Sequence, residues 1–431
     1  MLPRFFLLSV LLASATLAAG IAASQDVDGR RDSWTRFRGP QASGVADADL
    51  PVQWSDQKNL AWKTELPGKG SSSPVVWNDH IYLTAYDGYG LDVEDPGERS
   101  ALRLHVLCIG LDNGELIWDC EIEPSSEEQP VGKRIAEHGY ASPTPCADGS
   151  AVYASFGPSG VAAVSHDGEL LWRRNVGGET AGFGAAASPI LYRDLVIQNA
   201  SIESGKLFAL DKATGEIRWQ ADSIDRAWTT PTLVELPGGK TELIVNQKGA
   251  VLGFDPDTGD RLWQCDAIGD YVVPCVIARG DVLYCSGGRS NKTFAIRAGG
   301  RGDVSESHLL WEQSRGANVT SPILVGDYLY WSHDKAIALC LRASDGEEMF
   351  RERMPTRARV YASIVSDGKR LFLTTRDAGV LVLDAGPKYN ELAVNRLGDS
   401  EERFNATPAI VGDRLLLRSD QCLYCIRTDS N

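Results

Sequence analysis

The sequence predicts an all-β protein: an eight-bladed β-propeller of four-stranded antiparallel blades, with its ring closed by an N-terminal outer strand. One observation is a Ser/Thr-Pro step, or its equivalent, which opens an apolar stretch every 42–48 residues after a first interval of 69. A second is a Gly followed four residues later by a Trp or another large apolar residue. The third is that the last repeat unit lacks its outer strand, whereas an extra strand of this type precedes the first unit. A repeat of this length made only of strands is typical of a propeller blade.

The first mark occurs eight times. Its copies are Ser73-Pro74, Ser142-Pro143, Ser188-Pro189, Thr230-Pro231, Val273-Pro274, Ser321-Pro322, Ser363-Ile364 and Thr407-Pro408. The second mark occurs as Gly114/Trp118, Gly168/Trp172, Gly215/Trp219, Gly259/Trp263 and Gly346/Phe350. Between marks the chain alternates short apolar runs with turns, as in 323–325, the turn Gly326-Asp327, and 328–331. This pattern predicts two hairpins, and hence four strands, in each unit.

The two ends of the repeat region complete one blade. After Thr407-Pro408 the chain supplies three strands, the last at 425–427, and the missing outer strand stands at 60–63 with Trp62. Residues 60–431 are therefore expected to form the propeller, and residues 25–59 an arm over the closed ring, ordered by Trp34, Phe37 and Trp54.

Residues 1–24 have the features of a signal peptide: Arg4, an apolar run over 5–19, and small residues before position 24. We expect an exported monomer, periplasmic or secreted, with no integral membrane segment, because the apolar run is short for a membrane span. A net charge of −15 argues against nucleic acid as a partner, since an acidic surface repels it.

Segment 209–219 carries a recognisable motif. With Asp211, Thr214, Gly215 and Trp219, it resembles the tryptophan-docking motif of the pyrroloquinoline quinone (PQQ) repeat family, and 253–263 is a looser copy. The resemblance covers nearly all of 60–427 and implies the propeller fold. The family includes calcium- and PQQ-dependent alcohol dehydrogenases, the non-enzymatic assembly protein BamB, and many exported proteins without an assigned function. The opening Trp-Thr-Arg-Phe-Arg-Gly-Pro at 34–40 resembles the last group most closely.

Several motifs of known catalytic sites are absent from the sequence. The quinoprotein enzymes carry an adjacent Cys-Cys pair against the cofactor, and this chain has none. HExxH, GxSxG and phosphate-loop motifs are also absent. We therefore expect no catalytic residue, metal or cofactor, and a binding or scaffold protein that engages a protein or an extracellular polymer. Two alternatives stay open: a PQQ- and calcium-dependent dehydrogenase, and a BamB-like outer-membrane protein assembly factor.

The nine cysteines are not spaced as zinc ligands. Cys108, Cys340 and Cys425 fall in a column of small residues on the third strand of each unit, where a thiol serves as a small apolar group. Cys275 and Cys285 flank the turn at Gly280 almost symmetrically and are candidates for a cross-strand disulfide.

The candidate ligand site follows from propeller geometry. The loops entering the innermost strands converge on one end of the channel, and aromatic residues recur three positions before the Pro of the first mark. The predicted ligand-binding residues on these loops and on the loops between second and third strands are Tyr140, Trp228, Tyr271, Tyr361, Asn405, Arg226, Arg289, His333, Arg359 and Arg376. In the alternative interpretation, the aromatic residues plug the channel and pack the blades.

Two enlarged connections, 86–103 and 122–139, open on the same end and are rich in Asp and Glu. Enlarged loops on one face of a repeat scaffold favour that face as the binding face. Their acidity would suit a basic partner, a divalent cation or plain solvation.

Overall fold

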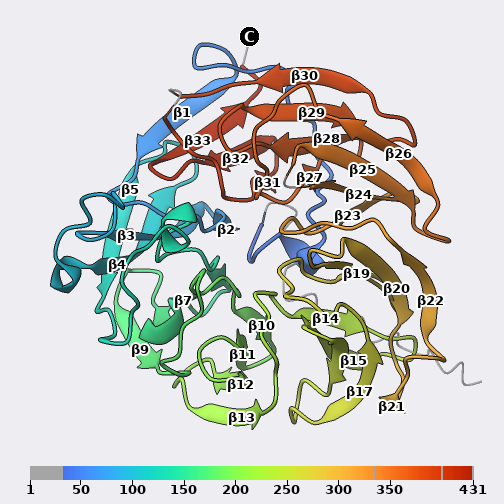
Figure 1. Ribbon diagram of the computed structural model, residues 1–431. Helices are drawn as coiled ribbons and strands as arrows, with labels where there is room; N and C mark the ends of the chain where they lie inside the picture. The colour runs from blue at the N-terminus through green and yellow to red at the C-terminus, as the bar shows by residue number, and fades with distance from the viewer. Residues whose placement is uncertain (1–32, 334, 399–400, 430–431) are drawn as a thin grey trace, which may run out of the picture. The chain divides into compact units, whose positions relative to one another are not determined.

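Eight sheets, each built on four antiparallel strands, follow one another along the chain and are arranged around a central axis in the computed structural model (Figure 1). The structure describes residues 33–333, 335–398 and 401–429. The predicted eight-bladed propeller is confirmed. The expected signal peptide, residues 1–24, and positions 25–32 of the expected arm lie outside the described residues.

Each blade contributes its strands from the channel outward. The first four blades are β2 (Val75–Trp77), β3 (His80–Asp87), β4 (Arg103–Gly110) and β5 (Leu116–Ile122); β6 (Cys146–Ala147), β7 (Val152–Ser155), β8 (Val161–Val164) and β9 (Leu170–Arg174); β10 (Ile190–Tyr192), β11 (Leu195–Ala200), β12 (Lys206–Asp211) and β13 (Ile217–Ala221); and β14 (Thr232–Glu235), β15 (Thr241–Gln247), β16 (Ala250–Phe254) and β17 (Arg261–Asp266). The fourth blade gains a fifth, parallel strand, β21 (Gly302–Asp303), on its outer edge.

The other four blades repeat this order. They are β18 (Ile277–Arg279), β19 (Val282–Gly287), β20 (Lys292–Arg297) and β22 (Leu309–Gln313); β23 (Ile323–Val325), β24 (Tyr328–His333), β25 (Ile337–Arg342) and β26 (Glu348–Arg353); β27 (Val365–Ser366), β28 (Arg370–Thr374), β29 (Val380–Asp384) and β30 (Glu391–Asn395); and β31 (Ala409–Val411), β32 (Arg414–Arg418), β33 (Cys422–Arg427) and β1 (Leu60–Glu65). Short 3-10 turns lie at η1 (Pro40–Ala42), η2 (Arg99–Ala101), η3 (Ile135–Glu137) and η4 (Gly157–Ser159).

The two ends of the described chain share the eighth blade. Strand β1 pairs antiparallel with β33, with Trp62 opposite Cys425 (Figure 1). Pairing first and last strands removes the seam that an open ring would leave.

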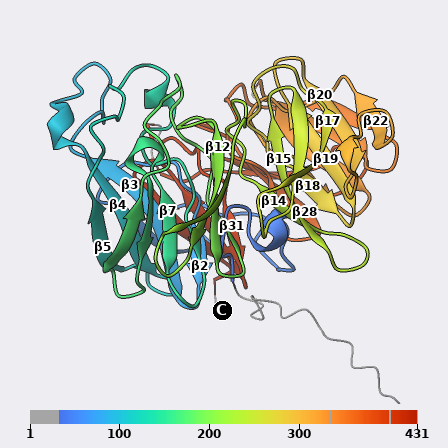
Figure 2. The same ribbon diagram turned by 90° about the horizontal axis from the view of Figure 1, so that it is seen from below.

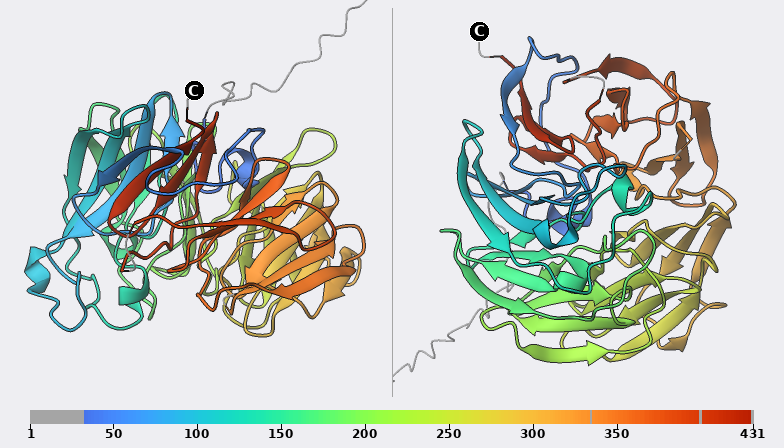
Figure 3. Two further views of the ribbon diagram at one scale, coloured as in Figure 1. Left: turned by 90° about the horizontal axis from the view of Figure 1, so that it is seen from above. Right: turned by 60° about the vertical axis from the view of Figure 1, so that its left-hand side comes forward.

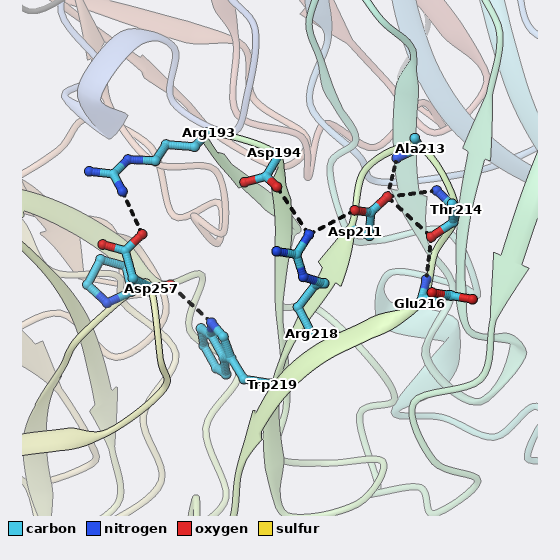
Figure 4. A network of polar contacts seen from close by, with 10 residues as sticks. Arg193, Asp194, Asp211, Ala213, Thr214, Glu216, Arg218, Trp219 and Asp257 are labelled. Atoms are coloured by element: carbon cyan, nitrogen blue, oxygen red, sulfur yellow. Dashed lines mark hydrogen bonds and ion pairs between the residues drawn. The ribbon is translucent and has the colours of Figure 1, made fainter.

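Tryptophans of the outer strands join neighbouring blades. Trp172 of the second blade donates from Nε1 to the carbonyl of Lys212 at 2.9 Å and covers Gly215 in the third blade. A Cβ atom at Gly215 would lie 2.5 Å from the Trp172 ring, so only glycine fits there. Trp219 repeats the arrangement one blade further on and donates to Pro256 O (Figure 4). The Gly and the Trp of one motif thus serve two different junctions.

The turn that presents this glycine is built by Asp211. Its carboxylate accepts the backbone N–H groups of Ala213 and Thr214, each at 3.0 Å, and an N–H of Arg218 at 3.0 Å (Figure 4). These contacts explain why Asp recurs in the motif, and Thr recurs because the Oγ1 of Thr214 accepts the backbone N–H of Glu216 at 3.2 Å.

The hydrophobic core lies between the faces of successive blades. One cluster combines Ile197 and Leu207 of the third blade with Leu243 and Phe254 of the fourth. Side chains of both sheets interlock there, so no blade buries its faces alone.

All nine cysteines are buried and free. Cys108, Cys340 and Cys425 lie opposite Trp118, Phe350 and Trp62 in the strand registers, where a small side chain leaves space for the large ring.

The Cys275–Cys285 disulfide does not form in the structure. The hairpin register pairs Ile277 with Tyr284, which sets Val276, and not Cys275, opposite Cys285. The two thiols therefore point to opposite faces of the sheet. Cys285 packs in the core, whereas Cys275 faces the channel.

Residues 33–59 cross one end of the channel. Trp34 exchanges backbone hydrogen bonds with Val76 in the first blade, and Ala46 donates to Ser366 in the seventh. Trp34 and Trp54 are 1% and 4% exposed, so the segment is packed against the ring. The β3–β4 connection projects at the other end (Figures 2 and 3). Among the described residues, no helix is long and apolar enough to cross a membrane.

Candidate functional site: the central cavity

A ring of hydrogen bonds surrounds the channel. At seven of the eight blade junctions, the residue two positions before the innermost strand donates its backbone N–H to the side chain of the equivalent residue in the next blade, at 2.9–3.3 Å among the described residues. The members of this polar ring are Ser73, Thr144, Ser188, Thr230, Cys275, Ser321, Ser363 and Thr407.

In two units, the Ser or Val of the first sequence mark is not the residue that joins the polar ring. In the second unit the ring residue is Thr144, two positions after Ser142, because the segment contains two successive Pro steps. In the fifth unit it is Cys275, and Pro274 precedes it. The Ser/Thr that recurs before Pro is thus primarily a junction between blades.

A second ring lies two residues earlier in each unit and lines the same cavity. Its members are Ser71, Ser142, Ala186, Trp228, Val273, Val319, Tyr361 and Asn405. The cavity has a volume of about 430 Å³, and Phe37 of the crossing segment contributes to its lining. This volume lies within the range of sites for small organic ligands.

Aromatic side chains at the cavity mouth carry arginines over their faces. The guanidinium carbons of Arg134 and Arg289 lie 5.4 and 5.3 Å from the ring centres of Phe183 and Tyr271. Trp228 stands between the two aromatic rings, edge to face with both. The result is an aromatic wall with positive charge at its rim.

The enlarged β5–β6 connection reaches across the mouth. Glu137, in η3, forms ion pairs with Arg376 and with Arg359, the latter at 3.8 Å. Its backbone carbonyl accepts a hydrogen bond from Asn405 at 2.8 Å. These contacts tie the connection to the seventh and eighth blades.

His138 follows Glu137 and also lines the cavity. Burial lowers its pKa to about 4, so the imidazole is neutral at pH 7. Its Nδ1 lies 2.5 Å from Ser142 Oγ. His138 is therefore a polar wall group and adds no charge at neutral pH.

Two buried carboxyls lie behind the same connection. Glu128 accepts a hydrogen bond from Ser159 Oγ at 2.5 Å, and Glu203 lines the same small pocket. Burial raises the pKa of each to about 7. Of the acidic residues expected on the enlarged connections, Glu128 is therefore buried and only partly ionised at pH 7.

Six of the ten predicted site residues line the cavity. They are Trp228, Tyr271, Tyr361, Asn405, Arg226 and Arg289. Arg359 and Arg376 contact lining residues, because the first hydrogen-bonds to the Tyr361 hydroxyl at 3.2 Å and the second covers its ring at 5.3 Å.

Tyr140 and His333 do not line the cavity. Tyr140 lies outside the wall because Pro145, and not Pro143, aligns the second unit with the others and places Ser142 in the wall. The tyrosine packs against Tyr86 with ring centres 5.4 Å apart. His333 contacts the Asn291 side chain at 3.0 Å.

Several lining residues were not predicted. Phe37 lies in the conspicuous Trp-Thr-Arg-Phe-Arg-Gly-Pro opening, but no pattern places it under the channel. Arg134 and Phe183 lie on irregular connections without a repeat to align them. Apart from Thr144, the Ser and Thr residues of the polar ring are those of the first sequence mark. Because the mark directly precedes the innermost strands, this position was the signal that could have placed them in the cavity wall.

Eight four-stranded blades, tryptophan docking between neighbours and a cavity in the channel define a propeller of the PQQ-repeat type. A family model described as outer membrane protein assembly factor BamB matches residues 103–352, more than half of the chain, and the chain belongs to this family of PQQ-like repeat propellers.

Known proteins show the same likeness. BamB from Alkalilimnicola ehrlichii is 25% identical over 217 residues, 50% of this chain and 48% of that protein. The match thus spans about half the length of this curated relative.

Solved structures show the likeness in fold. BamB from Moraxella catarrhalis superposes with a TM-score of 0.60 at 13% identity, covering 85% of this chain and 99% of that chain. Quinohemoprotein alcohol dehydrogenase from Comamonas testosteroni gives 0.62 at 11% identity, covering 93% and 81%. At these identities the similarity defines the fold alone.

Proposed function

We propose that the chain is an exported, non-enzymatic binding protein that engages a protein or polymer partner through the loop-rich end of its propeller. The observation that carries this proposal is the cavity at that end, with its aromatic wall of Phe183, Trp228 and Tyr271 beside the enlarged connections. Apolar area combined with a few polar groups is typical of binding sites. An aromatic residue whose only role is to pack blades together is expected to be buried. Phe183, in contrast, is 43% exposed.

Replacement of two aromatic residues of the cavity lining, the exposed Phe183 and the half-buried Tyr361, tests this proposal. Phe183→Ala and Tyr361→Ala are expected to weaken capture of a partner by the immobilised full chain while leaving the melting temperature nearly unchanged. Leu310→Ala is the matched control, because Leu310 is also 43% exposed but lies on the outer strand β22. A loss of stability without a loss of capture would favour the interpretation that the aromatic residues pack the blades.

A calcium-dependent quinone site does not fit the lining residues. Calcium takes six to eight oxygen ligands, commonly several carboxylates. The cavity lining contains one carboxylate, Glu137, which is already paired with Arg376. Within the described ranges, no group of three or more His, Cys, Asp or Glu residues could hold a metal ion. We therefore derive no redox step for this cavity.

A second candidate is a BamB-like role in the assembly of outer-membrane proteins. The family match over 103–352 and the name of the A. ehrlichii relative favour it. This role predicts that the tagged chain co-purifies with an outer-membrane β-barrel protein of its own cell. Recovery of the chain without any membrane barrel would contradict it.

A further inference from the structure

Three arginines at the cavity mouth have no acidic partner in the described part of the chain, unlike Arg359 and Arg376, which pair with Glu137. No carboxylate among the described residues lies within ion-pair distance of Arg134, Arg226 or Arg289, although all three line the cavity. Asp225 and Asp270, which lie next to Arg226 and Tyr271 in the sequence, accept backbone N–H groups instead. The mouth therefore carries a positive charge that the protein leaves uncompensated, within a chain whose net charge is −15.

Three further arginines lie behind the cavity lining: Arg38 and Arg418 are buried and Arg36 is half-buried. Arg36 and Arg38 flank the lining residue Phe37, and Arg418 donates to the carbonyl of Ser72 at 2.9 Å, between lining residues Ser71 and Ser73. All three guanidiniums keep N–H groups without a partner in the described part of the chain. Burial lowers the pKa of Arg38 to about 10 and that of Arg418 to about 9, so both are charged at pH 7.

The polar ring contributes hydrogen-bond donors. Six hydroxyls of this ring, Thr144, Ser188, Thr230, Ser321, Ser363 and Thr407, each accept a backbone N–H. A hydroxyl that accepts still has one proton to donate. No described residue accepts these protons, and all six residues line the cavity. The cavity is thus surrounded by hydroxyl donors and cations, and the one carboxylate of its lining, Glu137, is paired with Arg376.

We propose that the cavity binds a small, oxygen-rich organic acid, of which a uronic acid is the simplest probe. The guanidiniums neutralise the carboxylate, the ring hydroxyls donate to the other oxygens, and the aromatic wall covers the apolar face of the ligand. This inference rests on the proposed binding function and names the chemistry of its ligand. The acid comes either as a free molecule or as the end unit of an acidic polymer.

Calorimetric titration of the full chain with glucuronate and glucose tests the charge requirement, because the two differ by one carboxylate. Glucuronate is expected to bind at least tenfold more tightly than glucose. Arg226→Gln and Arg289→Gln should each weaken glucuronate at least tenfold. Arg193→Gln makes the same charge change in the β10–β11 hairpin at the opposite end and should leave the affinity unchanged.

A short glucuronate oligomer distinguishes the two sources of the ligand: tighter binding of the oligomer assigns the chain end, and equal affinities assign the free acid. Equal binding of glucose and glucuronate would overturn the inference. Arginine variants that bind glucuronate as tightly as the parent would also overturn it, as would the absence of heat with both glucuronate and its oligomer. Partner capture that depends on Phe183 would still support the proposed function in that case, so the two failures are distinguishable.

Discussion

Replacing Glu128 with Gln should remove a pH-dependent loss of stability. The pKa of Glu128 rises from 4.5 to about 7 because the carboxyl is buried. Below pH 4.5 both folded and unfolded states hold the proton, so the group costs nothing. As the pH rises toward 7, the unfolded state releases its proton first and is favoured. Above pH 7 the penalty on folding is complete and amounts to about 3 kcal/mol.

Glu128→Gln keeps the acceptor for Ser159 but never ionises. Its free energy of unfolding should match that of the parent near pH 4.5 and exceed it by about 3 kcal/mol at pH 8. Urea unfolding of both chains at half-unit pH steps measures this difference. Glu127→Gln, an exposed neighbour, is the control and should show no such trend. A constant difference between parent and Glu128→Gln across this pH range would refute the reasoning.

Two further predictions concern the junctions between blades. Gly215→Ala should lower the free energy of unfolding by about 2–4 kcal/mol, because the φ of Gly215 is 68° and the new Cβ would clash with the Trp172 ring. Gly238→Ala, also at positive φ but with open space around it, should lower it by about 1 kcal/mol. Urea unfolding compares the two variants, and equal losses of stability would contradict the docking argument. Ser188→Ala should lower the free energy of unfolding by about 1–3 kcal/mol, because it leaves the buried N–H of Thr144 unpaired. Ser188→Thr keeps a hydroxyl acceptor and should restore most of this stability. An alanine variant as stable as the parent in the same assay would show that this hydrogen bond contributes nothing to stability.

The fold was predictable because each blade repeats the same solution. The spacing of the marks gave the number of blades, and Trp62 beside the N-terminal arm indicated which end supplies the last outer strand. Repeats allow such inference because an error in one unit is corrected by the others. Where a unit carried two Pro steps, as at Pro143 and Pro145, no local signal chose between them.

The site was only partly predictable for a related reason. Trp228 and Tyr361 stand at positions that the repeat defines, so their convergence followed from the topology. Phe37, Arg134 and Phe183 come from segments outside the repeat, and their place depends on packing that no periodicity encodes. The excess of positive charge at the mouth was invisible in a composition dominated by acids.

Closure of the eighth blade has a consequence for how the chain folds during synthesis. Leu60 pairs with Ile426, so β1 has no partner until almost the whole described chain has been made. Contacts so distant in sequence are slow to form, and an unpaired strand edge is prone to pair with other chains. The central cavity, which takes lining from Phe37 at one end of the chain and Thr407 at the other, exists only after that pairing. A truncated chain that lacks β33 would therefore lose its binding site and, at the same time, expose an unpaired strand edge that is prone to aggregation.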